Sequence, residues 1–148
     1  MGAGRTVLGI SCYYHDSAAA LVRDGEVVAA AQEERFNRDK YSNLFPINGI
    51  NYCLQAGDAT VSDLDSVSFY EKPFLKLWRV IFGHLRSYPR SLKNFIETMP
   101  AWLEDRLIFP LVLRRELGYE GEVLFHKHHP VHGASPFLAS PFADPVTL

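Results

Sequence analysis

Apolar and polar positions alternate along the first part of the chain in the manner of a β-sheet. Thr6 to Cys12 and Ala18 to Val22 are β-branched and apolar runs of strand length, and a third run spans Glu26 to Glu34. The second and third runs are separated by Asp24-Gly25. An Asp-Gly pair between apolar runs is a strong hairpin signal, because its glycine accepts a positive φ. We therefore expect the chain to open with three consecutive antiparallel strands.

The period then changes to that of a helix. Ile50 and Leu54 follow Pro46 at helical spacing, and Gly57 supplies a C-terminal stop. Proline starts a helix without losing a needed hydrogen bond, so the sequence predicts a helix from about Pro46 to Gly57. Leu64 to Tyr70 alternates again and predicts a strand.

Residues 73–117 predict a helical insertion made of short amphipathic pieces. Four prolines divide it: Pro73, Pro89, Pro100 and Pro110. The insertion ends near Gly118, and Glu122 to His126 returns to strand character. Together these elements predict an α/β fold. Pro145 to Leu148 begins what resembles another strand, so we expect residues 1–148 to be one incomplete domain, truncated at Leu148.

Composition supports a globular domain. The 148 residues carry a net charge of −2 and are 47% hydrophobic. No N-terminal segment resembles a signal peptide, and charges interrupt every apolar run before about 18 residues. We expect a cytoplasmic protein with no membrane partner. Cys12 and Cys53 lie in apolar periodic segments and are expected to be buried thiols without a redox role.

Charge is unevenly distributed along the chain. Residues 71–117 hold nine Lys/Arg and five Asp/Glu, whereas the remainder holds six and twelve. Basic residues interleaved with aromatic ones can form a nucleic-acid surface, but aromatic residues at helical spacing are more often core. An excess of four positive charges is small, and we expect no nucleic-acid partner.

A histidine cluster is the first candidate for chemistry. His128 and His132 are four residues apart, a spacing that places two imidazoles on one helix face, where both reach one metal ion. Pro130 fits best at the first helical position, which makes this argument approximate. The alternative is that these residues, with His126 and His129, only decorate a helix start.

The predicted loop from Tyr13 to Ser17 is the second candidate. Its His15 could transfer a proton near neutral pH, with Asp16 as an orienting partner. The loop could also present backbone N–H groups and a small hydroxyl to a phosphate. Alternatively, Asp16 and Ser17 are ordinary turn formers.

Three cations follow the third predicted strand: Arg35, Arg38 and Lys40. Cations at a strand end are well placed for phosphate contacts. A solvated charged loop accounts for them equally well.

Taken together, three stretches resemble one family. They are Leu8 to Gly25, which includes His15-Asp16-Ser17, then Ala31-Gln32-Glu33-Glu34-Arg35-Phe36, and then His128-His129-x-x-His132 followed by Ala134-Ser135. Their order and spacing resemble the nodulation-type and antibiotic-type O-carbamoyltransferases. The resemblance implies the first part of an actin-like, Hsp70-like (ribonuclease H-like) ATPase domain, related to the enzymes of tRNA threonylcarbamoyl transfer.

The resemblance also implies a reaction. A missing C-terminal adenylate-forming domain would convert carbamoyl phosphate and ATP into a carbamoyl-adenylate. The actin-like domain would then pass the carbamoyl group to a hydroxyl of a sugar, an antibiotic or a similar small-molecule acceptor. The fragment alone is expected to be inactive, and the full-length protein to form a homodimer.

Residue roles follow from the same resemblance. His15 matches the catalytic base at the acceptor hydroxyl, and Tyr13 lies near the acceptor. Lys40 matches a nucleotide-contacting lysine. His128 and His132 match two ligands of a divalent metal, iron first, with magnesium or zinc as alternatives.

The sequence also departs from the family pattern. Pro130, Gly133 and Pro136 replace residues that the family usually has there, and an expected Asp-Gly-x-Gly-Glu motif would begin past Leu148. Two other interpretations remain open. The first is an actin-like sugar kinase or ATPase fragment, which has no need of the histidine pair. The second is a non-catalytic metal-binding interaction module, which has no need of His15.

Overall fold

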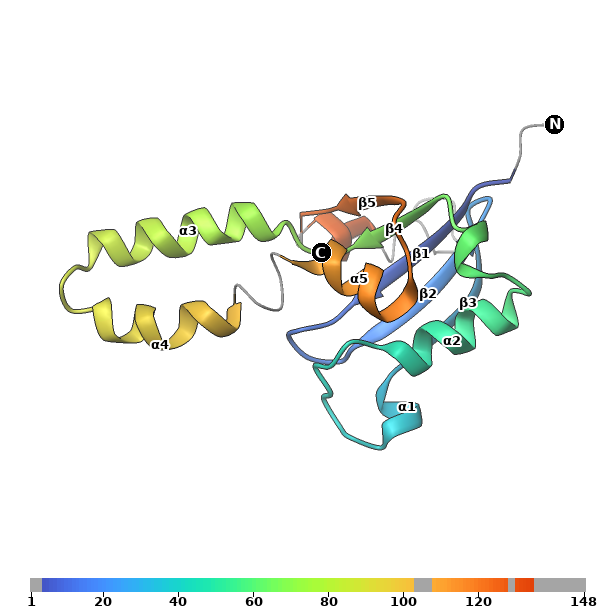
Figure 1. The fold of residues 1–148 in the computed structure, drawn as a ribbon, viewed down its shortest axis with the longest axis horizontal. Coiled ribbons are helices and arrows are strands. Elements are labelled where there is room, and N and C mark those ends of the chain that lie inside the picture. The colour runs from blue at the N-terminus through green and yellow to red at the C-terminus, as the bar shows by residue number, and fades with distance from the viewer. Residues whose placement is uncertain (1–3, 103–107, 128–129, 135–148) are drawn as a thin grey trace.

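A mixed β-sheet of five strands forms the centre of the computed structural model, which describes residues 4–102, 108–127 and 130–134 (Figure 1). The strands are β1 (Thr6–Ser11), β2 (Ala18–Arg23), β3 (Glu26–Gln32), β4 (Ser66–Phe69) and β5 (Glu122–Phe125). Their order in the sheet is β3-β2-β1-β4-β5. β2 is antiparallel to β1 and β3, whereas β4 is parallel to β1 and β5. The C-terminal ends of β1, β3, β4 and β5 therefore meet at one edge of the sheet.

The predicted opening of three antiparallel strands is confirmed. Asp24 and Gly25 connect β2 to β3 with φ angles of 54° and 86°. Positive φ at both central residues is the geometry of a type I′ turn, whose twist matches that of the flanking strands. The Asp24 Oδ1 atom also accepts a hydrogen bond of 2.8 Å from the backbone N–H of Arg5.

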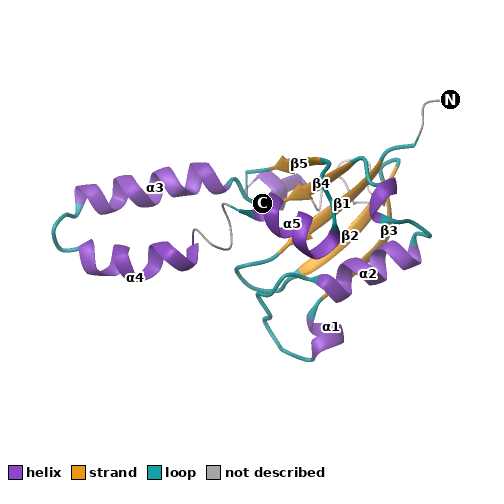
Figure 2. Cartoon of the chain, in the orientation of Figure 1, coloured by secondary structure: helices purple, strands orange, loops and turns teal. Residues whose placement is uncertain are grey.

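The described helices are α1 (Glu34–Asn37), α2 (Ile47–Ala56), the 3₁₀ turn η1 (Val61–Asp63), α3 (Pro73–Arg86), α4 (Leu92–Trp102) and α5 (Phe109–Leu117). Two of them, α2 and α5, cover one face of the sheet, as Figure 2 shows. Alternate strand residues such as Leu8, Leu21 and Phe69 are buried there, and Phe69 stacks on Phe109 of α5 with 4.0 Å between ring centroids.

Both cysteines lie in or beside this core. Cys12 and Cys53 are free and buried, as predicted. The Sγ atom of Cys53 donates a hydrogen bond to the carbonyl of Ala19, and burial raises the pKa of its thiol. A buried, protonated thiol is a packing group and not a nucleophile.

Helices occupy the basic segment as expected, but their boundaries differ in one place. Pro73 lies in the first turn of α3 and Pro110 in that of α5, which the left-handed Gly118 closes. The prediction that Pro100 ends a helical piece is wrong, because α4 continues through it. Because proline has no N–H, α4 lacks the helical hydrogen bond from residue 100 to the carbonyl of Ile96, but it continues to Trp102.

α3 and α4 form an antiparallel hairpin that projects away from the sheet, whereas α5 returns to cover it (Figure 1). None of the described helices is long and apolar enough to cross a membrane.

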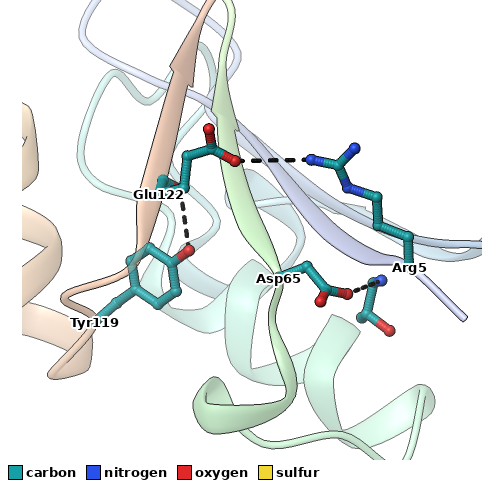
Figure 3. Close-up of polar contacts among 5 residues, drawn as sticks. Arg5, Asp65, Tyr119 and Glu122 are labelled. Atoms are coloured by element: carbon teal, nitrogen blue, oxygen red, sulfur yellow. Dashed lines mark hydrogen bonds and ion pairs between the residues drawn. The ribbon is translucent and has the colours of Figure 1, made fainter. Parts of the chain in front are cut away.

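The edge of the sheet where β1, β4 and β5 begin is held by polar contacts (Figure 3). Asp65 accepts a hydrogen bond of 2.7 Å from the Thr6 backbone N–H, and Arg5 lies 3.7 Å from the Glu122 carboxylate. The Tyr119 hydroxyl donates to the Glu122 carbonyl at 3.0 Å, and burial raises the pKa of Tyr119. These contacts hold together the starts of β1, β4 and β5.

Substitution of Gly57, at the end of α2, tests how α2 packs on the sheet. Gly57 follows the last residue of α2 and has a φ of −91°, which any residue can adopt. The glycine is therefore explained by the close approach of another side chain and not by a left-handed backbone. A Cβ there would collide with the fully buried Leu21 side chain. Gly57→Ala should therefore lower the free energy of unfolding by about 1–3 kcal/mol.

Gly83→Ala is the matched control. Apart from the neighbouring backbone of α3 itself, no atom of the described residues lies within 4 Å of a Cβ added at Gly83, in the interior of α3. Alanine there should raise stability by up to about 1 kcal/mol, because it is the better helix former. Urea unfolding of both variants measures the difference, and equal effects would contradict the proposed contact with Leu21.

Candidate functional site

Several segments with polar side chains meet at the edge where the parallel strands end. The Tyr13–Ser17 loop follows β1, Arg35 follows β3, Tyr70 follows β4 and His126 follows β5. In sheets that contain parallel strands, ligands commonly bind outside the carboxyl ends of the strands. This edge is therefore the candidate functional site.

A hollow of about 810 Å³ lies beside this edge, and its lining combines strand residues with Phe36 of α1 and Tyr52 of α2. Small residues on β1 to β4 line its floor: Gly9, Ser11, Ala18, Ala20, Ala30 and Ser68. Larger side chains from the strand ends, α1 and the helical segment 130–134 also line it: Gln32, Arg35, Tyr70, His126 and Val131. Small side chains on the sheet leave space for a ligand of nucleotide or sugar size.

The Tyr13–Ser17 loop is held by backbone hydrogen bonds on both sides. The N–H groups of Tyr13 and Ser17 donate to the carbonyls of Asn43 and Ser42, at 2.8 and 2.9 Å. The Ser17 carbonyl accepts a further bond of 2.8 Å from the Glu33 N–H. The loop is thus fixed between the end of β3 and the segment that precedes α2.

Glu33 connects this loop to α2. Its buried carboxylate accepts hydrogen bonds from the Asn48 side-chain amide at 2.6 Å and from the Gly49 backbone N–H at 2.9 Å. The Asn48 backbone N–H lies 3.4 Å from the same carboxylate. A carboxylate at a helix N-terminus satisfies N–H groups that have no partner in the helix and interacts favourably with the helix dipole.

Unusual backbone angles concentrate in the same region. Six described residues other than glycine have positive φ, and four of them, Tyr13, Asp16, Arg38 and Tyr41, belong to the β1–β2 loop and the segment after α1. Such conformations are costly and persist where the surrounding structure holds them. Their position at the ends of β1 and β3 supports a functional assignment for this edge.

His15 and Asp16 form the most specific chemical arrangement in the loop. The Nδ1 atom of His15 lies 2.7 Å from the Asp16 Oδ2, and their side chains are 58% and 38% exposed. An ionised Asp16 accepts the Nδ1 proton and leaves the Nε2 lone pair available to take a proton. The hydrogen bond agrees with the predicted orienting partnership of these two residues.

Other predicted residues lie at this edge in different settings. The Tyr13 ring packs against Phe109 with 6.4 Å between ring centroids, so part of its side chain belongs to the core. Lys40 is exposed in the segment that carries Tyr41 and Ser42. Arg35 lines the hollow directly, whereas Arg38 closes α1.

The predicted metal pair is described only in part. His132 is exposed on a helical segment over residues 130–134, next to Val131 of the hollow. His128 lies outside the described residues. Across the described ranges, no three His, Cys, Asp or Glu side chains converge as metal ligands. The described donors alone thus do not make a metal site, and we derive no step through a metal.

Two residues of the site were missed by sequence reasoning. Glu33 was placed in a charged strand end and in one of the family-like stretches, without a role of its own, and Tyr70 was seen only as the end of a strand. The Tyr70 hydroxyl donates to the Cys12 carbonyl at 3.1 Å and so connects the ends of β4 and β1. The available signal for Tyr70 was its position directly after a strand that is parallel to β1.

Comparison with known proteins shows which family the chain resembles. A family model described as the carbamoyltransferase N-terminus matches residues 6–147. An uncharacterized protein of Synechocystis, sll1178, is 45% identical over 150 residues, which cover 96% of this chain and 24% of that protein. Nodulation protein NolNO of Sinorhizobium fredii is 34% identical over 139 residues, which cover 92% of this chain and 19% of that protein.

A shorter similarity is also found. An uncharacterized 19.2 kDa protein in the syrM 5′ region of Rhizobium etli is 48% identical over 58 residues, or 39% of this chain. The chain therefore spans about a quarter and a fifth of the length of the two relatives that it matches over nearly its whole length.

Proposed function

The chain belongs to the carbamoyltransferase N-terminus family, and from this membership we propose that it contributes the acceptor-side machinery of an O-carbamoyltransferase. The full-length protein would make a carbamoyl-adenylate from carbamoyl phosphate and ATP, and transfer its carbamoyl group to a hydroxyl of a sugar, an antibiotic or a similar acceptor. The domain would have the actin-like ATPase fold, of which this chain is the first part.

The hydrogen bond between His15 and Asp16 is the observation that carries the proposal. Asp16 fixes the tautomer in which the His15 Nε2 atom can accept a proton from an acceptor hydroxyl. The hydroxyl oxygen attacks the carbamoyl carbon, its proton passes to Nε2, and the bond from that carbon to the adenylate oxygen breaks with loss of AMP. Tyr13, at the start of the same loop, would lie beside the acceptor.

The cations and the hollow support binding of a nucleotide. Arg35 lines the hollow and Lys40 follows in the next segment, and such cations neutralise phosphate charge. The Ser17 hydroxyl is buried and has no hydrogen-bond partner among the described residues. A buried hydroxyl without a partner is costly, which favours a further polar group in this loop.

We also propose that His128 and His132 supply two ligands of a divalent metal, iron first. A metal bound beside the nucleotide would act as a Lewis acid on the phosphate oxygens. The support is the four-residue spacing and the position of His132 beside the hollow.

Replacing both histidines with alanine tests this assignment. The double variant of the full-length protein should lose its bound metal, and the affinity for ATP should fall. In the unmodified protein, metal content should also decrease in acid, because a protonated imidazole cannot coordinate. Elemental analysis and ATP titration measure these effects. His84→Ala, in α3 and away from the edge, is the control, and unchanged metal content in the double variant would reject the ligand assignment.

A further inference from the structure

The helical hairpin of α3 and α4 exposes an unusual amount of apolar surface. Trp78, Phe82, Leu85 and Ile96 are 59%, 58%, 64% and 62% exposed, and Leu92 is also exposed. Trp78 and Phe82 contact each other, with 5.5 Å between ring centroids. Large apolar side chains grouped on a projecting element commonly mark an interaction surface.

Trp78, Leu85, Leu92 and Ile96 lie on one side of the hairpin, and Phe82 contacts Trp78 toward the outer face of α3. The rings of His84 and Phe95 are 4.9 Å apart and identify the faces of α3 and α4 that contact each other. At about 100° per residue, Leu85 and Trp78 lie roughly a quarter-turn to a third of a turn from the contacting face of α3, and Phe82 lies nearly half a turn from it in the same sense. Ile96 has a similar offset on α4, and Leu92 a smaller one in the same sense. Because the two helices run antiparallel, equal rotation in each brings the stripes to the same side, which we name the apolar flank.

The hairpin is also strongly basic. Residues 73–102, which span α3 and α4, contain five Lys/Arg and one acidic residue, which gives a net charge of +4 against −2 for the whole chain. Exposed Arg79 and Arg86 follow the apolar residues around α3, and exposed Arg90 and Lys93 lie at and just after the turn. Apolar and basic side chains thus form adjacent stripes on the hairpin, and this hairpin projects away from the sheet (Figure 1).

We infer that the apolar flank binds the surface of an anionic lipid bilayer. An amphipathic helix with Trp, Phe and Leu on one face and Lys/Arg beside them lies in the headgroup region, with its apolar face inserted. Each basic residue near an anionic surface adds further attraction. This inference differs from the expectation of no membrane partner. That expectation rested on the absence of a spanning segment and of a signal peptide, and neither bears on a contact at the bilayer surface.

Charge argues against a second copy of the chain as the occupant. Two hairpins joined flank to flank would bring together two segments that each carry a net charge of +4, and such like charges repel. An anionic bilayer instead offers both opposite charge and an apolar interior to the same face. The inference is independent of carbamoyl transfer, since none of these side chains lines the hollow.

Co-sedimentation of the full-length protein with vesicles tests the inference. The protein should bind vesicles of phosphatidylglycerol and phosphatidylcholine, bind phosphatidylcholine alone weakly, and be released as salt rises. Phe82→Ser combined with Leu85→Ser should reduce the partition coefficient about tenfold or more. Arg79→Gln combined with Arg86→Gln should reduce it by a factor of about ten to thirty.

Matched variants keep the test specific. Leu111→Ser removes an equally exposed leucine from α5, and Arg114→Gln combined with Arg115→Gln removes two exposed cations from the same helix. Both controls should bind vesicles as the unmodified protein does, and circular dichroism shows whether each variant is folded. Absence of binding to anionic vesicles overturns the inference, as does equal loss in hairpin and control variants. A dimer that dissociates in the hairpin variants, without vesicle binding, would identify a second copy as the occupant and also overturn it.

Discussion

Replacement of His15 with alanine should lower the rate of carbamoyl transfer by about 10²–10⁴-fold, the usual contribution of a general base. The loss should appear in kcat, because Nε2 accepts its proton only as the acceptor oxygen attacks. ATP affinity and metal content should remain unchanged, since they depend on other side chains. His15 is 58% exposed, so its removal should not unfold the domain.

Two further variants make this prediction specific. Asp16→Asn keeps a polar side chain but can stabilise the wrong His15 tautomer, so transfer should fall although the imidazole remains. His84→Ala removes a histidine from α3 and should leave transfer unchanged. Steady-state rates with the acceptor in excess measure transfer by all three variants. Undiminished transfer by the His15 variant would contradict the assignment of His15 as the base.

Replacement of Glu33 with alanine should destabilise the domain by about 2–4 kcal/mol. The buried carboxylate accepts hydrogen bonds from the Asn48 side chain and the Gly49 N–H. Alanine would leave both donors without this acceptor. The Glu33 N–H also holds the Ser17 carbonyl, so the β1–β2 loop should loosen with the start of α2. Urea unfolding measures the free energy, and hydrogen exchange at residues 13–17 and 47–50 measures the loosening.

Glu26→Ala is the control for this second prediction. Glu26 is exposed at the start of β3, and its removal should change stability by less than about 0.5 kcal/mol. Glu33→Gln retains one acceptor oxygen and should give an intermediate loss. If the two alanine variants unfold at the same urea concentration, Glu33 is not the anchor that we describe.

Much of the sheet could be predicted because its signals are local. The Asp24-Gly25 turn and the alternation on either side of it determine β2 and β3, and Pro46 and Gly57 delimit α2 within a residue. Even so, the reason for Gly57 lies outside α2, in its contact with Leu21. A residue type can thus be predicted correctly while its physical cause is tertiary.

The site itself depended on tertiary structure. Glu33 and Asn48 are 15 residues apart, and Tyr70 and Cys12 are 58 residues apart, so no periodicity connects them. The hollow arises only when strands far apart in sequence place Gly9, Ala20 and Ser68 side by side. In contrast, His15 and Asp16 are adjacent in sequence, and their partnership could be predicted from composition and loop position alone.

The most direct test of the account follows the carbamoyl group itself. The full-length protein is incubated with ATP, a panel of hydroxyl acceptors and carbamoyl phosphate labelled at its carbon. We predict that label enters a hydroxyl acceptor only when ATP is present, with release of AMP, and that the His15→Ala protein fails to transfer it. Transfer of phosphate from ATP to the acceptor, with no labelled carbon incorporated, would contradict the account and identify a kinase.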